Sequence, residues 1–165
     1  MLDLKIIQNE RTVTITKHVE FEACHNLLDY EGKCKNLHGH TYKLEVALYG
    51  KVNEKGFLID FKDLKALLES AILNKVDHQY LNEVFDREFN LKDVNTTCEN
   101  LVWVFWMALE AEMSKQPEIY KDIHVLNLRL WETSNSFATL SHHEMLPFQL
   151  HNDIQYSGGK IDGCE

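Results

Sequence analysis

The sequence predicts an α+β fold in which an antiparallel sheet carries helices on one face. Three observations support it: two early stretches alternate apolar and polar residues, two central stretches repeat apolar residues at helical spacing, and two late stretches alternate again. The expected strands are 11–25, 37–50, 123–133 and 136–142. Because the chain shows no internal repeat, we expect one domain over 1–165, with its core at about 11–142 and a C-terminal extension at 143–165.

The first two strands place histidines on the same face as apolar residues. In the first strand this face holds Val13, Ile15, Val19, Phe21, Ala23 and His25, with Lys17 as the exception. In the second strand it holds His38, His40, Tyr42, Leu44, Val46 and Leu48. Side chains two apart on a strand point the same way. If the two strands pair through the loop 26–36, three imidazoles meet at one end of a core-facing surface.

The first helix is expected to begin after Asp60, a good N-cap. Its apolar residues recur at helical spacing: Phe61, Leu64, Leu67, Leu68, Ala71 and Ile72. The segment 75–95 that follows is polar and acidic. We expect it to be a loop with turns at Asp77-His78 and at Leu81-Asn82.

The second helix is expected to start at Thr96 or Thr97, where Thr96-x-x-Glu99 matches a capping box. Its run 101–109 is apolar on every side. Such a helix must be covered on every side. Oligomerisation could provide the cover, and so could a two-layer core.

The third strand, 123–133, ends in a carboxylate. One of its faces holds His124, Leu126, Leu128, Leu130 and Glu132. A carboxylate at the end of an apolar face is costly unless it has a partner or a cationic ligand. The fourth strand follows a turn at Ser134-Asn135, and the polar chain after Pro147 is expected to be loosely ordered.

The composition limits the partners. A net charge of −9 argues against nucleic acid, although a small phosphorylated substrate needs only a local basic patch. The first ten residues lack the apolar core of a signal peptide. The longest apolar run, 101–109, is too short to span a membrane. Reduced thiols in the cytoplasm are expected for the four cysteines, which lack C-x-x-C spacing: Cys24, Cys34, Cys98 and Cys164.

Three imidazoles without an obvious fourth protein ligand suit a catalytic zinc that keeps one position open. The simpler alternative is that His25, His38 and His40 are only hydrogen-bonded in the core. A further alternative makes Cys34, four residues before His38, the fourth ligand of a closed structural site.

Six motifs occur in the order typical of one known family: FEACHNL, C-x3-HGH, GFLIDFKDLK, VDHQYLN, TTCENL and LWET. From about His18 to Leu140 the chain therefore resembles the 6-pyruvoyltetrahydropterin synthase and 6-carboxytetrahydropterin synthase family. The resemblance implies the tunnelling fold (T-fold), a ββααββ subunit whose sheets close into barrels. It also implies a homo-oligomer, usually a hexamer of two trimers, with active sites between subunits.

The resemblance also implies the site residues. The zinc ligands would be His25, His38 and His40. The catalytic cysteine would be Cys34, and the catalytic Asp-His pair would be Asp77 and His78. The pterin anchor would be Glu132, with Thr97, Cys98 and Glu99 near the pterin ring. The family normally has Ser or Thr where this chain has Cys98, so a hydroxyl contact from that position is in doubt.

These residue types suit the family's substrate, 7,8-dihydroneopterin triphosphate. Zinc with an open position can bind the two side-chain hydroxyls as a Lewis acid. Cys34, as a thiolate beside zinc or Lys33, could move protons at the side-chain carbons. His78, oriented by Asp77, would be the second acid/base group.

Two further assignments concern substrate binding. Glu132 could accept two N–H bonds from the amino-pyrimidinone edge of the pterin, although it could instead pair with an arginine or cap a neighbouring chain. Lys33 and Lys35 are candidates for the triphosphate, or else solvated charges of the loop. Outside the family context, Asp77-His78 would be an ordinary surface turn.

The spacing between Cys34 and His38 favours one reaction. Three residues separate them, as in bacterial 6-carboxytetrahydropterin synthases of queuosine biosynthesis, whereas 6-pyruvoyl synthases tend to have a longer insert. A third branch uses a glutamate in this loop, but Glu31 does not fit that pattern. We therefore expect 6-carboxytetrahydropterin, acetaldehyde and triphosphate as products, with the 6-pyruvoyl reaction as the alternative.

Two readings from other classes remain. One is a non-catalytic zinc- or pterin-binding protein, against which Cys34 with Asp77-His78 argues. The other is a cupin-type metal enzyme. It is disfavoured because Glu45 should face away from the histidines and no second cupin motif follows.

Overall fold

The computed structural model describes residues 11–146. The sequence predictions for the first ten residues and for the chain after 146 lie outside this range. The elements follow the chain in this order: β1 (Thr12–His25), the 3₁₀ turn η1 (Lys33–Lys35), β2 (His38–Lys51), α2 (Phe61–Leu68), the π-helical η2 (Glu69–Leu73), α3 (Asn74–Val76), β3 (Gln79–Tyr80), α4 (Leu81–Phe89), α5 (Cys98–Met113), α6 (Pro117–Tyr120), β4 (Ile123–Thr133) and β5 (Ser136–Ser141). All four predicted strands and both predicted helices are present, so the α+β class is confirmed.

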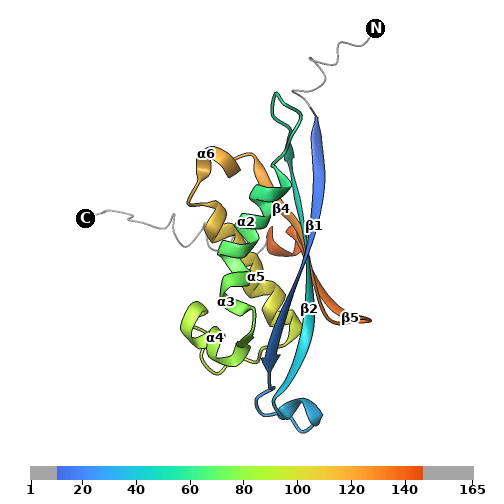
Figure 1. The fold of residues 1–165 in the computed structure, drawn as a ribbon, viewed down its shortest axis with the longest axis vertical. Coiled ribbons are helices and arrows are strands. Elements are labelled where there is room, and N and C mark those ends of the chain that lie inside the picture. Colours follow the sequence, from blue (N-terminus) through green and yellow to red (C-terminus); the bar gives the residue numbers. More distant parts are fainter. Residues whose placement is uncertain (1–10, 147–165) are drawn as a thin grey trace, which may run out of the picture.

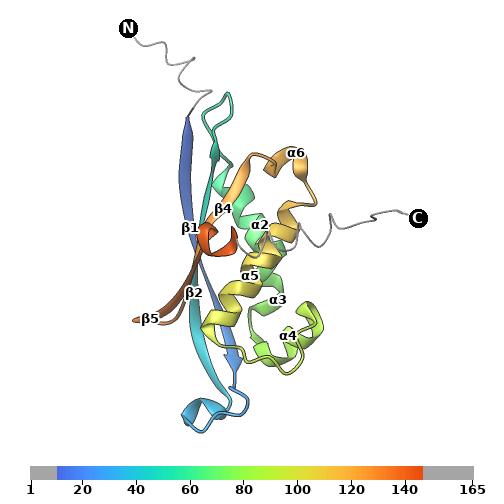
Figure 2. The same ribbon diagram turned by 180° about the vertical axis from the view of Figure 1, so that it is seen from behind.

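The strands form one sheet in the order β3-β1-β2-β4-β5. β1 and β2 pair antiparallel along their whole length, from Thr12 opposite Lys51 to His25 opposite His38. β4 and β5 extend the antiparallel sheet. The short β3 lies parallel to β1 and makes the sheet mixed, which the sequence pattern did not predict. Helices α2 to α6 cover one face of the sheet and leave the other open (Figures 1 and 2).

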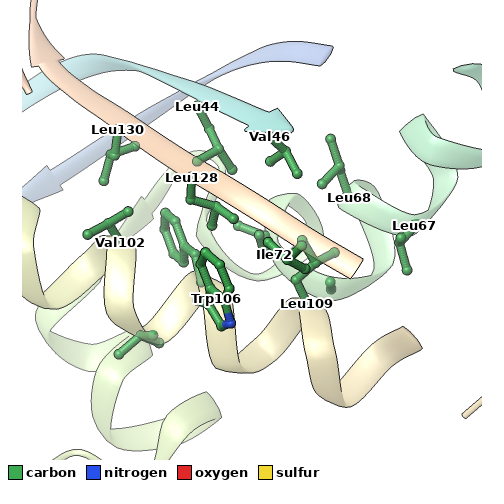
Figure 3. Close-up of a cluster of buried hydrophobic side chains, with 14 of the residues drawn as sticks. Leu44, Val46, Leu67, Leu68, Ile72, Val102, Trp106, Leu109, Leu128 and Leu130 are labelled. Carbon is green, nitrogen blue, oxygen red and sulfur yellow. The ribbon is translucent and has the colours of Figure 1, made fainter. Parts of the chain in front are cut away.

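The core lies between this covered face and the helices. Figure 3 shows side chains of β2 and β4 directed toward α2, η2 and α5: Leu44, Val46, Leu128 and Leu130 meet Leu68, Ile72, Val102, Trp106 and Leu109. Burying one such side chain contributes about 1.5–3 kcal/mol. Most of the apolar run in α5 is buried within this one chain, leaving Met107 38% exposed. The two-layer core therefore provides the cover, and oligomerisation is not needed for it.

The helix caps were predicted in part. The Asp60 side chain accepts a 2.7 Å hydrogen bond from the Lys62 amide, as expected of an N-cap. The capping box at Thr96 is wrong, because Thr97 is the N-cap of α5 and its hydroxyl accepts from the Asn100 amide at 3.3 Å. Thr96 is fully buried and bonded to His25 instead.

The prediction of a loop over 75–95 is confirmed for 90–95 and for the turn at Asp77-His78, but it is wrong for 81–89, where a turn was expected at Leu81-Asn82. Residues 74–76 continue the first helical segment, and α4 occupies 81–89 with Leu81, Val84 and Phe85 buried. These three residues have the i, i+3, i+4 spacing of a helix face. The surrounding charges hid this short apolar stripe. Asn90 ends α4 in the left-handed conformation, with φ +55°.

A β-bulge changes the face of β4 along its length. Opposite Ala47 and Leu48, β4 holds one extra residue, because Ala47 pairs with Asn127 and Leu48 with Val125. Before the bulge Ile123 and Val125 are buried, and after it Leu128 and Leu130 are. The prediction that His124 and Leu126 share the apolar face is therefore wrong, since an inserted residue shifts the alternation by one.

Candidate active site

Three histidines meet where β1 ends and β2 begins. His25 pairs with His38 across the hairpin, and His40 lies two residues further along the same face of β2. The ring centroids are 4.5 Å apart for His25–His38, 4.9 Å for His38–His40 and 5.2 Å for His25–His40. One ring nitrogen from each lies within 4.8 Å of the others, and the described residues contain no second group of this kind.

Backbone carbonyls orient two of the three rings. His25 Nδ1 donates to Thr96 O at 2.9 Å, and His38 Nδ1 donates to Asn36 O at 2.8 Å. Because a carbonyl oxygen only accepts, both Nδ1 atoms carry the proton and both Nε2 atoms keep a free lone pair. His40 Nε2 is buried and has no hydrogen-bond partner within the described part of the chain. These three nitrogens are therefore available to a metal ion.

Burial favours the neutral form of two of the three imidazoles, those of His25 and His40. Desolvation lowers the pKa of His25, against the opposing effect of its bond to Thr96. Desolvation likewise lowers the pKa of His40, against the charge of Glu132. Neutral imidazole is the form that binds metals. Cys34 is not a member of the group, so the donor set is three imidazoles and fits a zinc site with an open position.

A carboxylate and a phenol border the triad. Glu132 Oε1 lies 3.5 Å from His25 Nε2 and 3.9 Å from His40 Nε2. Glu132 occupies an irregularity of β4, between the Trp131–Phe137 and Thr133–Ser136 pairs. These contacts are with imidazoles and not with an arginine. The Tyr42 hydroxyl lies 3.4 Å from His25 Nε2, and burial raises the pKa of Tyr42, so it stays protonated.

Cys34 lies in the middle of η1, in the loop that joins His25 to His38. Cys34 is half-buried, and its carbonyl accepts a 2.9 Å hydrogen bond from the Leu27 amide. The flanking Lys33 and Lys35 are exposed. The thiol therefore belongs to the connection between the two strands that carry the zinc-ligand candidates, and it is not a member of their group.

Asp77 and His78 form a close pair at the edge of the sheet. Asp77 Oδ1 lies 2.9 Å from His78 Nδ1 and accepts a 2.9 Å hydrogen bond from the Glu22 amide. His78 adopts φ +58°, uncommon for a residue with a side chain. Its amide donates to Glu22 O, which holds that conformation. The side chains are 76% and 45% exposed for His78 and Asp77, so the pair is oriented but open to solvent.

A cleft of about 460 Å³ follows this edge of the sheet. It is lined by Glu22, Ala23, Cys24, Gly39, His40, Thr41, His78, Gln79 and Tyr80. Glu22 and Thr41 belong to the face that the helices leave open. His40 is the triad residue that borders the cleft, so the cleft brings His40 and His78 to one opening.

The start of α5 lies against β4. Cys98 Sγ donates to Leu130 O at 3.0 Å, and burial raises the pKa of the Cys98 thiol from 9.0 to about 11. Thr97 is the N-cap, and Glu99 is exposed in the first turn. Of these three predicted pterin contacts, Cys98 is therefore the one tied to the strand that carries Glu132.

Sequence reasoning missed three residues of the site. Tyr42 follows His40 by two on the same strand face, a signal that was readable but was assigned to the core. Thr96 and Asn82 act through contacts with residues far away in sequence, and no spacing rule identifies such contacts. Hydrogen-bond partners of this kind become visible only in the folded chain.

An α+β subunit with three clustered imidazoles at one end of its sheet has a group that could hold a metal ion, as in metal-dependent enzymes. Residues 14–143 match the 6-pyruvoyl tetrahydropterin synthase family, and the chain belongs to that family. The resemblance predicted from the motifs is thereby confirmed.

Relatives with two different names are similar to the chain. The 6-carboxy-5,6,7,8-tetrahydropterin synthase of Haemophilus influenzae is 30% identical over 142 residues, covering 75% of this chain and 95% of the relative. The 6-pyruvoyl tetrahydrobiopterin synthase of Dictyostelium discoideum is 34% identical over 140 residues, covering 78% and 95%. The solved 6-pyruvoyl tetrahydropterin synthase of Caenorhabditis elegans aligns with a TM-score of 0.64 at 27% identity, covering 79% of this chain and 96% of that one. The tunnelling fold is thereby confirmed.

Proposed function

We propose that the protein is a zinc-dependent 6-carboxy-5,6,7,8-tetrahydropterin synthase of 7-deazaguanine (queuosine) biosynthesis. Its reaction would convert 7,8-dihydroneopterin triphosphate and water to 6-carboxytetrahydropterin, acetaldehyde and triphosphate. The observation that carries the proposal is the cluster of His25, His38 and His40, with Glu132 3.5 Å from His25. The relative from Haemophilus influenzae bears the name of this enzyme.

The triad would hold zinc through its three imidazoles and leave a position for the substrate side chain. When bound, zinc polarises the substrate's hydroxyls as a Lewis acid. Thr96 and Asn36 keep the His25 and His38 rings in the required tautomer by accepting their Nδ1 protons. The protonated hydroxyl of Tyr42 borders the site on its buried side, 3.4 Å from His25 Nε2.

Cys34 and His78 would move the protons. A thiolate at Cys34 takes a proton from a side-chain carbon of the substrate, and His78 serves as the second acid/base group. Asp77 Oδ1, 2.9 Å from His78 Nδ1, would hold the proton on that nitrogen and leave Nε2 for the substrate. General acid–base groups of this kind contribute about 10²–10⁴-fold each.

Glu132 would anchor the pterin ring. Its carboxylate can accept two N–H bonds from the amino-pyrimidinone edge. In the chain by itself the carboxylate lies against His25 and His40, so pterin binding requires the side chain to turn away from them. At 29% exposure in a bulged part of β4, the side chain has room to turn. Thr97, Cys98 and Glu99 would border the ring from α5, and Lys33 would neutralise triphosphate.

We further propose a homo-oligomer, a hexamer of two trimers, in which the Asp77–His78 pair of one chain completes the site of another. The His78 side chain is 76% exposed, so within one chain its proton exchanges freely with water. A second chain would cover the imidazole and exclude that water. Both edges of the sheet can accept another copy: among the described residues, Thr12–Phe21 of β1 pair only with β2, and β5 pairs only with β4.

The cytoplasm is the proposed location, since Cys24, Cys34 and Cys98 are all free thiols. Within residues 11–146, none of the helices combines the length and apolar character that crossing a membrane requires.

The test is to incubate the zinc-loaded protein with 7,8-dihydroneopterin triphosphate and to identify the products by mass spectrometry. We expect acetaldehyde and 6-carboxytetrahydropterin. Triphosphate with 6-pyruvoyltetrahydropterin would overturn the choice of product and keep the site. No turnover by folded, zinc-loaded protein would overturn the synthase assignment and favour a zinc- or pterin-binding role.

A further inference from the structure

The loop that carries Cys34 is held by two asparagine side chains. Asn82 Oδ1 accepts from the Asn26 amide at 3.1 Å, and Asn82 Nδ2 donates to Asn26 O at 2.9 Å. Asn95 Oδ1 accepts from the Leu28 amide at 2.5 Å, and Asn95 Nδ2 donates to Leu28 O at 3.1 Å. Each carboxamide thus satisfies both backbone groups of one loop residue, as a neighbouring strand would.

The residue between these two anchors contacts Cys34 directly. Leu27 lies between Asn26 and Leu28, and its amide donates to Cys34 O at 2.9 Å. Because Asn26 and Leu28 are held in place, the backbone bond from Leu27 also fixes the backbone of Cys34. Around η1, the Lys35 amide donates to Gly32 O and the Asn36 amide donates to Lys33 O, and both bonds join residues three apart.

The same anchors reach the histidine triad. The Thr96 hydroxyl donates to Asn82 Oδ1 at 3.4 Å, while Thr96 O accepts the Nδ1 proton of His25. Asn100 Nδ2 donates to Asn95 O at 2.9 Å, which fixes Asn95 to the first turn of α5. The Tyr80 hydroxyl donates to the Asn26 side chain. The elements that orient His25 are thus also the elements that hold the loop.

We propose that Asn82 and Asn95 are positioning residues that fix the Cys34 thiol relative to the histidine triad. The inference rests on the proposed function, in which Cys34 is an acid/base group. Displacing a reacting group by about 1 Å can cost on the order of 100-fold in rate. Losing either carboxamide should therefore lower turnover without removing the metal ligands.

The experiment compares Asn82→Ala and Asn95→Ala with a matched control, Asn53→Ala. The Asn53 side chain also accepts from backbone amides, those of Lys55 at 2.9 Å and Phe57 at 3.1 Å, but in the turn at the far end of the β1–β2 pair. Each variant is assayed for zinc content, thermal unfolding, kcat, KM, and the rate at which iodoacetamide alkylates Cys34, followed by peptide mass spectrometry.

We expect Asn82→Ala and Asn95→Ala to keep zinc and KM within about 3-fold, and to lose about 10- to 100-fold in kcat. Cys34 should react with iodoacetamide at least about 5-fold faster in both, because the loop opens more often. Asn53→Ala should lower the unfolding temperature and leave kcat and alkylation unchanged.

Two results would overturn the inference. One is wild-type kcat and alkylation in either folded, zinc-loaded variant. The other is an equal loss of kcat in Asn53→Ala, which would reduce the effect to general stability. Cys34→Ala is measured alongside to separate this failure from failure of the proposed function. Wild-type turnover in Cys34→Ala would show that Cys34 takes no part in the reaction. Alkylation of Cys34 in the two asparagine variants would still report whether the asparagines hold the loop.

Discussion

His25 is 1% exposed, whereas the side chain of His78 is 76% exposed. In both imidazoles Nδ1 lies 2.9 Å from an oxygen, Thr96 O in one case and Asp77 Oδ1 in the other. The triad is built from two strands, with His25 buried and His38 and His40 partly buried, and is bordered by Glu132 and Tyr42. The Asp77–His78 pair lies at the edge of the sheet, where it is bonded to Glu22 and to the Leu73 carbonyl. One chain thus brings all three proposed metal ligands together, while it leaves the proposed acid/base pair open to solvent.

The largest effect should come from removing one histidine of the triad. His40→Ala removes one of three metal ligands, so we expect zinc affinity to fall by more than about 100-fold, the upper range for losing a mere partner of a ligand. Turnover should fall below detection. Metal analysis per chain checks this, with His124→Ala as the control, because His124 lies exposed on β4 outside the metal group. One zinc per chain in His40→Ala would contradict the assignment.

Cys34→Ala should separate the thiol from the metal. Since Cys34 is outside the metal group, we expect full zinc occupancy. Turnover should fall by about 10²–10⁴-fold, the range for losing a general acid or base. Steady-state kinetics and metal analysis on one preparation check both statements. Loss of zinc together with stability would instead make Cys34 a structural ligand.

His78→Gln should have a smaller effect, about 100-fold in kcat, with zinc and stability retained because the side chain is exposed. Asp77→Asn should cost less still, about 10-fold, since it disturbs only the orientation of His78. Comparing kcat and KM of the two variants tests this order. Unchanged turnover in His78→Gln would reduce the pair to a surface turn.

The smallest expected effect is on the reactivity of Cys98. Burial raises the pKa of its thiol to about 11. The folded protein should keep this thiol protonated at pH 8, so alkylation should be at least about 10-fold slower than at Cys34. Because the folded pKa is raised, the neutral thiol imposes no penalty below its ordinary 9.0, and stability is lost as the pH rises from there through about 11. Alkylation of folded and urea-unfolded protein checks this, and equal rates would contradict it.

The same contrast explains which features the sequence could predict. Period-two alternation located β1, β2 and the three histidines, because burial of one strand face leaves that pattern in the residues. It failed at β4, where one inserted residue at the bulge moved His124 and Leu126 to the open face.

Contacts between distant residues left no pattern of this kind. Thr96 looked like a capping residue, and Asn82 looked like part of a turn. Their roles depend on β1 and the loop after it lying beside α4 and the start of α5. The short helix α4 was hidden for a related reason, since only Leu81, Val84 and Phe85 mark its buried face.

The most direct test of a site shared between chains mixes two inactive variants. Cys34→Ala and His78→Gln are unfolded together in equal amounts, refolded with zinc and assayed, beside each variant refolded alone. If the site takes Cys34 from one chain and His78 from another, random mixing leaves about a quarter of the sites intact. We predict recovery of about a quarter of wild-type turnover. No recovery, in a mixture shown to form mixed oligomers, would place both residues of each site in one chain and contradict the account.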